Sequence, residues 1–151
     1  MDWFVKAFLK SSLAWFATGV TLGLAMAVYP PLAVYRIAHL HLNLLGFVGQ
    51  MIYGVSLHVV PRFFGHPIVY PRLAAAQFWL AQAGLVLLAT GFALRVPGIG
   101  GASVLIASGA TLSAAAAYCY IVNIWRTIDA SSMRPLARGR PVPLQHQPQA
   151  D

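Results

Sequence analysis

The sequence predicts an all-α integral membrane protein, folded as a four-helix bundle with both termini in the cytoplasm. The first observation is composition: hydrophobic residues make up 59% of the 151 residues and charged residues only 9%, whereas soluble domains carry roughly 25% charged residues. The second is that the apolar residues form four continuous runs, each near the ~20 residues that a helix needs to cross a bilayer. Their continuity, without polar alternation, excludes membrane β-strands.

The four runs are separated by segments that contain proline or arginine. They cover residues 12–29, 39–60, 73–94 and 101–125. We therefore expect one four-span transmembrane domain over residues 1–126. Residues 127–151 are rich in Pro, Arg and Gln and show no periodic apolar pattern, so we expect a disordered, basic cytoplasmic tail there.

The positive charges predict the orientation of the spans. With four spans, the N-terminus, the second loop and the C-terminal tail share one side of the membrane. Basic residues are concentrated on that side: Lys6, Lys10, Arg62, Arg72, Arg126, Arg134, Arg138 and Arg140, against Arg36 and Arg95 on the other. This bias places both termini in the cytoplasm of a bacterial-type inner (plasma) membrane. Because these charges lie between apolar runs rather than on one amphipathic face, we expect no nucleic-acid partner.

The acidic residues limit the chemistry that the chain can perform. Asp2, Asp129 and Asp151 are the only acids, and none lies inside an apolar run. Paired-carboxylate catalysis is thereby excluded from the apolar body, and no acid is available to orient a histidine for nucleophilic catalysis. The single cysteine, Cys119, allows no intrachain disulfide.

Histidines are the most informative residues, because a histidine inside a membrane span is rare and usually functional. His39 and His41 lie at the predicted extracytoplasmic end of the second run, and His58 lies at its cytoplasmic end. On a helical wheel at 100° per residue, one face carries His39, Asn43, Gly46, Gln50, Tyr53 and Leu57. His41 points about 200° away from His39, so the two imidazoles cannot ligate one metal ion from the same helix.

The possible ligands in the apolar runs suit haem better than they suit zinc. Zinc takes four ligands in a closed site, and the other three runs contain neither histidine nor acid. Haem needs one or two axial ligands and a large apolar pocket, which a small helical bundle can provide. Arg36, one turn before His39, is placed either to pair with haem propionates or to extend to the membrane interface. Copper is the alternative metal, with His39, His41 and methionines as ligands.

The stretch RIAHLHLNLLGFVGQMIYGVSLHVVPRFFGH, residues 36–66, resembles the second transmembrane helix of haem-copper oxidase catalytic subunits (subunit I), especially the C-type cytochrome c oxidases and nitric oxide reductases. His41, Asn43, Gly54 and Pro61 carry this likeness. The stretch is also similar to the NnrS family of haem- and copper-containing membrane proteins. That second likeness rests on His39, His41, Gly46, Phe47, Gly49, Gly54, Val60, Pro61 and Gly65.

The resemblance implies a low-spin haem b ligand at His41, or at His39 under the second alignment; we favour His41. The later oxidase helices, with the copper-ligating histidines and the second haem ligand, have no counterpart among these four runs. The second ligand would come from a homodimer partner, with two haems per dimer, or from a larger membrane complex. His58 would suit a second haem in the other leaflet.

We therefore expect an oxidase subunit I-like, haem b-binding membrane protein that transfers electrons or binds NO, CO or O2. Enzymatic activity stays open, and we lean against it for the isolated chain. One alternative is a copper-handling membrane protein. The other is a cofactor-free accessory subunit of a larger respiratory complex, packed through its small residues. The Gly19-x-x-x-Gly23 pattern in the first run suits packing within the bundle or self-association.

Overall fold

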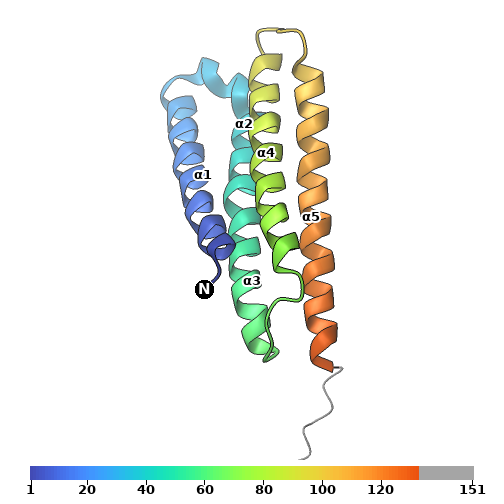
Figure 1. Cartoon of the computed structure of the whole chain (residues 1–151). Coiled ribbons are helices and arrows are strands. Elements are labelled where there is room, and N and C mark those ends of the chain that lie inside the picture. Colours follow the sequence, from blue (N-terminus) through green and yellow to red (C-terminus); the bar gives the residue numbers. More distant parts are fainter. Residues whose placement is uncertain (133–151) are drawn as a thin grey trace, which may run out of the picture.

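The chain forms an antiparallel bundle of long helices in the computed structural model, which describes residues 1–132 (Figure 1). In chain order the elements are α1 (Trp3–Val28), the 3-10 helix η1 (Pro30–Tyr35), α2 (Arg36–His41), the π-helix η2 (Leu42–Gly49), α3 (Gln50–Phe63), α4 (Pro71–Arg95) and α5 (Ala102–Ser132). Because α2, η2 and α3 follow one another without a break, they form one long helix. The described part of the chain thus holds four helices long and apolar enough to cross a membrane, which confirms the predicted fold class.

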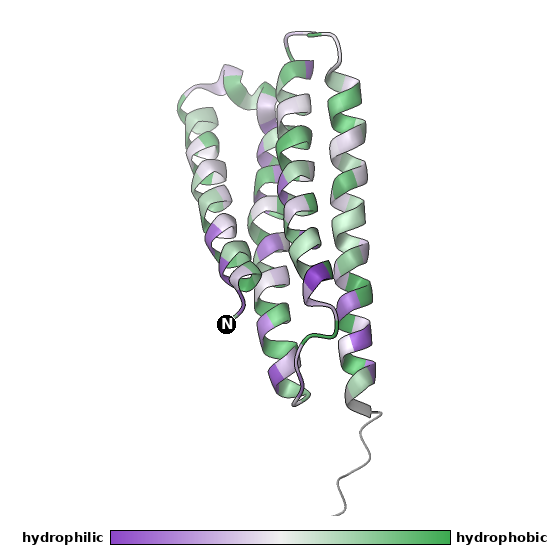
Figure 2. Cartoon of the chain, viewed as in Figure 1, coloured by the Kyte–Doolittle hydropathy of each residue, from purple (hydrophilic) through white to green (hydrophobic). Residues whose placement is uncertain are grey.

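The surface of the bundle suits a hydrocarbon solvent. Apolar and neutral residues cover most of the length of the helices, and strongly hydrophilic residues gather near their ends (Figure 2). Large apolar side chains such as Leu24, Val104 and Tyr118 are more exposed than buried. In the membrane these side chains face lipid, so their exposure carries no hydrophobic penalty.

Helix ends differ from the limits of the apolar runs. α1 begins at Trp3 rather than at residue 12, so Lys6 and Lys10 lie within the helix with exposed side chains. Pro61 lies inside α3 instead of ending it. α5 continues to Ser132, past the predicted end at residue 125, so the first residues assigned to the tail are helical. Residues 133–151 lie outside the described residues.

The N-terminus, the loop between α3 and α4, and the end of α5 lie at the same end of the bundle (Figure 1). The four-span scheme predicts this arrangement. Which side of the membrane this end faces stays a prediction from the charges. Of the described basic residues, Arg36 and Arg95 border the opposite end.

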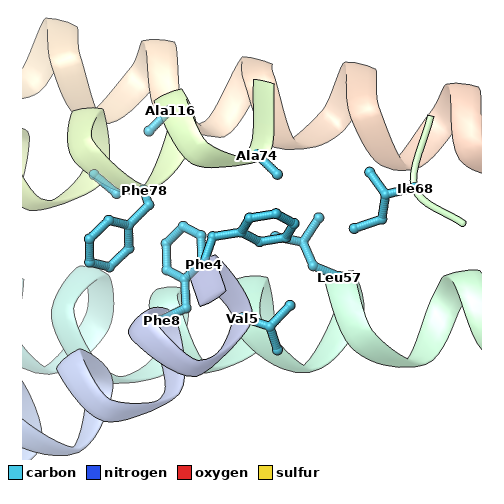
Figure 3. Close-up of a cluster of buried hydrophobic side chains, with 9 residues drawn as sticks. Phe4, Val5, Phe8, Leu57, Ile68, Ala74, Phe78 and Ala116 are labelled. Carbon is cyan, nitrogen blue, oxygen red and sulfur yellow. The ribbon is translucent and has the colours of Figure 1, made fainter. Parts of the chain in front are cut away.

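Aromatic and aliphatic side chains close the core at the N-terminal end (Figure 3). Phe8 is fully buried, and its ring packs edge-on against Phe78 with 5.1 Å between centroids. The cluster draws on every long helix and on the loop before α4, and it contains Phe4, Val5, Phe8, Leu57, Ile68, Ala74, Phe78, Ala81 and Ala116. It joins α1 to α4 at this end.

Helices α4 and α5 touch through their backbones at three glycines, which we call the glycine seam: Gly84, Gly91 and Gly109. A Cβ built on Gly109 would lie 2.6 Å from the backbone nitrogen of Leu88 and 2.8 Å from the backbone oxygen of Gly84. A Cβ on Gly91 would lie 2.9 Å from the backbone nitrogen of Ile106. Small residues allow this close approach, which is the main source of helix association where lipid removes the hydrophobic drive.

A polar layer ties α1, α3 and α4 together inside the bundle. It consists of Ser11, Trp15, Gln50 and Gln82. The Gln50 Oε1 atom accepts hydrogen bonds from Ser11 Oγ at 2.6 Å and from Gln82 Nε2 at 2.7 Å. Gln82 Nε2 also donates to Ser11 Oγ at 2.9 Å, and Trp15 Nε1 donates to Gln82 Oε1 at 3.0 Å. Such bonds between membrane helices contribute about 0.6 kcal/mol each on average.

The π-helix keeps one face of the second long helix pointed inward. Its buried residues recur every fourth position: Ala38, Leu42, Gly46, Gln50 and Gly54. In a straight α-helix each step of four residues would rotate the buried position by about 40°. The wider turns of η2 absorb that drift. The predicted inward stripe is thus confirmed at Gly46, Gln50 and Leu57, which are buried.

The loop before α4 is fastened to the end of α5. Asn123 Oδ1 accepts from the Tyr70 backbone N–H at 3.2 Å, and Asn123 Nδ2 donates to the Tyr70 carbonyl at 3.0 Å. Thr127 Oγ1 accepts from the Val69 N–H, and His66 Nε2 lies 2.6 Å from the Thr127 carbonyl. Asn123 and Thr127 are fully buried. These contacts explain why α5 extends beyond the apolar run.

We predict that Gly109→Ala destabilises the bundle, because the new methyl group would meet the backbone of α4. Overpacking of this kind costs about 1–3 kcal/mol. The measurement is the thermal unfolding midpoint of the purified chain in one detergent. Gly100→Ala is the matched control, since a Cβ there meets nothing within 4 Å. Equal midpoints for the two variants would contradict the close contact.

We predict opposite effects for two buried glutamines. Gln77 is fully buried, and neither Nε2 nor Oε1 has a partner in the described part of the chain. Gln77→Leu should therefore raise the free energy of unfolding by about 1–3 kcal/mol. Gln50→Leu should lower it, because Ser11 and Gln82 lose their shared acceptor. Chemical unfolding in mixed micelles measures both, and a destabilised Gln77→Leu protein would show that its amide has a partner.

Candidate functional site

His39 lies between the second long helix and α1. Its ring is half-buried, with Nδ1 3.0 Å from the Gly19 carbonyl oxygen. Since a carbonyl can only accept, Nδ1 carries the proton in this contact. A Cβ built on Gly23 would lie 3.0 Å from His39 Cε1. The imidazole is therefore enclosed on its α1 side by a glycine.

Asn43, one turn further along, occupies the other half of the same cradle. Its Nδ2 donates to the His39 carbonyl at 2.9 Å and lies 3.3 Å from the ring Nδ1. A Cβ on Gly19 would lie 2.7 Å from the Asn43 side-chain amide. The Gly19-x-x-x-Gly23 pattern thus receives His39 and Asn43 of the same chain. Of the two uses expected for it, packing within the bundle is the one observed.

His41 faces in another direction and has different neighbours. Its Nδ1 lies 2.8 Å from the Ile37 carbonyl oxygen, one turn back on the same helix. The ring stacks on Phe92 of α4, with 4.8 Å between centroids and 28° between planes. The carbonyl partner assigns the proton to Nδ1, so the lone pair lies on Nε2. No residue in the described part of the chain hydrogen-bonds to His41 Nε2.

Four exposed apolar side chains follow His41 along the second long helix, and we call them the apolar strip: Leu44, Leu45, Val48 and Ile52. Leu44 is 60% exposed and Ile52 is 50% exposed. Their exposure places these residues on the outer surface of the bundle. His39 packs on α1 and His41 packs on α4, so the two imidazoles point in different directions, as their spacing on the helix predicts.

His58 lies near the other end of the second long helix. Its ring contacts Nη1 of Arg62, one turn along α3. It lines a cavity of about 370 Å³ together with Asp2, Pro61 and His66. This cavity is open at the N-terminal end of the bundle, far along the helix from His39 and His41. In residues 1–132, α1, α4 and α5 contain no histidine that could face His58.

Arg36 begins α2 and is exposed. It makes no hydrogen bond or ion pair within residues 1–132. Its position, five residues before His41, leaves its guanidinium free to reach a charged group beside that end of the helix. The structure therefore places an exposed arginine at the same end of the second long helix as His39 and His41, and His58 at the other end.

The donor set defines what this region can hold. Within the described residues, no group of three His, Cys, Asp or Glu side chains could bind a metal ion. His41 Nε2 is a single available ligand next to an apolar surface, whereas a closed zinc site requires four ligands. The sequence identifies His41 as a candidate ligand but does not identify Phe92 as its neighbour. Nothing in the third apolar run indicates which of its residues contacts the second run.

Comparison with known proteins adds an independent line of evidence. The family described as Cytochrome C and Quinol oxidase polypeptide I matches residues 4–141. The Cbb3-type cytochrome c oxidase subunit CcoN1 of Stutzerimonas stutzeri is 34% identical over 89 residues, covering 55% of this chain and 19% of that protein. Cytochrome c oxidase subunit 1 of Rhodobacter capsulatus is 36% identical over 66 residues, covering 43% of this chain and 12% of that protein.

The chain thus spans about a fifth or less of the length of these curated relatives. The family match, in contrast, extends over all four long helices. An all-α bundle with a histidine-bearing second membrane helix agrees with that match. This multi-pass membrane protein belongs to the Cytochrome C and Quinol oxidase polypeptide I family.

Proposed function

We propose that this chain is a haem b-binding membrane protein in which His41 supplies one axial ligand through Nε2. The hydrogen bond from His41 Nδ1 to the Ile37 carbonyl carries the proposal. Metal-ligating histidines commonly donate their other ring N–H to a carbonyl or carboxylate, which fixes the tautomer and makes the ligating nitrogen more basic. His39 uses Nδ1 in a similar way, but its ring is enclosed by α1.

The apolar strip next to His41 supports the same assignment. A haem needs apolar surface on both sides of the ring, and Leu44, Leu45, Val48 and Ile52 would cover part of one side. The stack on Phe92 and the bond to the Ile37 carbonyl restrict rotation of the imidazole. Arg36 would lie near the haem edge, where its guanidinium can pair with a propionate.

We propose that a second polypeptide supplies the rest of the pocket. In the described part of the chain no second histidine shares the outward face of His41. A homodimer would bring an equivalent face and a second imidazole, and a larger membrane complex would do the same with a different chain. Family membership and the relatives' names favour a respiratory assembly in a bacterial inner membrane.

A haem iron supplies a one-electron redox couple and, when one axial position is open, a site for NO, CO or O2. The role of this chain would be to bind and orient that group and to exclude water from one side of it. With ligands on both sides, electron transfer is the expected activity. Reduction of O2 by this chain alone is not part of the proposal, since it spans so little of its oxidase relatives.

We predict that His41→Gly abolishes haem binding and that added imidazole restores it. The variant leaves the Ile37 carbonyl and the Phe92 ring in place, so free imidazole can enter the vacated position. The measurement is a haem titration of the purified full-length chain in detergent, followed by the Soret band, with a pyridine haemochrome assay for haem type. His58→Gly is the matched control and should retain the Soret band of the His41 haem; a fall in haem per chain in this variant would indicate the second haem expected at His58.

The spectra also separate the alternatives. A reduced spectrum unshifted by CO indicates two axial ligands and electron transfer, and a CO-shifted band indicates gas binding. If the wild-type chain shows no Soret band even when haem is supplied during expression, the haem proposal fails. Copper that is bound by the wild type and lost in His41→Gly would then support the copper-handling alternative. If the wild type binds neither haem nor copper, the chain is a cofactor-free accessory subunit.

We predict a different result for His39→Ala. Removing this ring deletes the contact with the Gly19 carbonyl and opens a cavity between α1 and α2, so the thermal unfolding midpoint should fall. The haem stoichiometry of the folded fraction should match that of the wild type. Loss of haem from folded His39→Ala protein, with haem retained by His41→Gly, would reassign the axial ligand to His39.

A further inference from the structure

A groove of about 740 Å³ runs along the outside of the bundle where α4 begins and α5 ends. It lies at the opposite end from His41 and takes no part in the proposed haem site. Its walls are mainly apolar, and its charged side chains are both arginines. The residues that matter here are Tyr70, Arg72, Leu73, Ala76, Val122 and Arg126.

Charge and apolar surface are separated along this groove. Gly84 lies against Ser113 and Gly91 against Ile106, so the antiparallel register brings the start of α4 level with Arg126. Arg72 and Arg126 therefore sit together near the end of the bundle. Ala76 and Val122 each lie four residues further in, which is about 6 Å closer to the middle of the bundle.

The two arginines present exposed positive charges at the groove. Both side chains are exposed, and neither makes a hydrogen bond or ion pair within residues 1–132. Among residues 1–132, no acid lines the groove itself. Asp129 lines an adjoining hollow that shares Val122 and Arg126 with the groove. The first turn of α4 adds no acid and no capping side chain, so the helix dipole increases the positive potential there.

The inner wall of the groove is held by the loop contacts described above. Both hydrogen bonds between Asn123 and Tyr70, and the bond from Val69 to Thr127, join the start of α4 to the end of α5. A site whose walls are already fixed loses less conformational entropy when it binds a ligand.

We propose that this groove binds one anionic phospholipid, with the phosphate between Arg72 and Arg126 and an acyl chain along Leu73, Ala76 and Val122. The order of the groups matches that of a lipid in a bilayer, with charge at the surface and hydrocarbon toward the middle. Basic side chains at a membrane surface attract anionic lipid, and the uninterrupted apolar wall distinguishes a lipid from a free phosphate ion.

The test compares dioleoyl phosphatidylglycerol with dioleoyl phosphatidylcholine on the full-length chain, titrated in neutral detergent and followed by native mass spectrometry. We expect phosphatidylglycerol to bind about tenfold more tightly. Arg72→Gln/Arg126→Gln should abolish that preference. Lys6→Gln/Lys10→Gln removes the same charge at the same end, outside the groove, and should keep it.

A second variant tests the apolar wall without changing charge. Ala76→Phe fills the groove at an exposed position, so it should weaken phosphatidylglycerol binding while the fold is retained. Equal affinity of the wild type for the two lipids would overturn the proposal, as would equal losses in the arginine and lysine variants. Displacement of the lipid by millimolar inorganic phosphate would also overturn it, since the acyl chain would then contribute nothing.

Discussion

The close contact between α4 and α5 determines where most functional parts of the molecule lie. With no side chain at Gly84, Gly91 or Gly109, the two backbones meet, and this contact fixes the register of the pair. Three side chains of α4 are positioned in this way. Phe92, next to Gly91, meets His41, and Gln82, at the middle of α4, joins the polar layer. Arg72, at the start of α4, lines the groove. A wider separation would shift all three relative to their partners, because interiors packed at this density cannot absorb a translation.

Much of the fold follows from the sequence because lipid leaves the backbone few choices. A segment in hydrocarbon must satisfy its own hydrogen bonds, so four long apolar runs imply four helices. Their ends are less predictable. Lys6 and Lys10 look like flanking charges, yet they project outward from a helix that begins at Trp3. Thr127 looks like the start of a polar tail, yet it is buried against the loop before α4.

The sequence identifies the histidines of the candidate site, but it does not predict which side chains surround each of them. Spacing alone separates His39 from His41, because two positions on a helix point in very different directions. Spacing does not predict which of the two imidazoles has a ring nitrogen without a partner, because that depends on neighbours from other helices. Glycines of α1 enclose His39, whereas Phe92 of α4 supports His41 and leaves Nε2 available. No sequence pattern indicates that the glycines of α1 contact His39 or that Phe92 contacts His41.

The π-helix makes the second long helix sensitive to its own length. Residues 42–49 separate the histidine-bearing turns from Gln50, and their wider turns set the angular phase between the two. Deleting one residue there would leave a plausible helix, but it would rotate everything after the deletion by about a quarter of a turn relative to His39 and His41. Gln50 would then face away from Ser11 and Gln82. An insertion or deletion in this stretch is therefore expected to be far more damaging than a substitution, even at positions that face lipid.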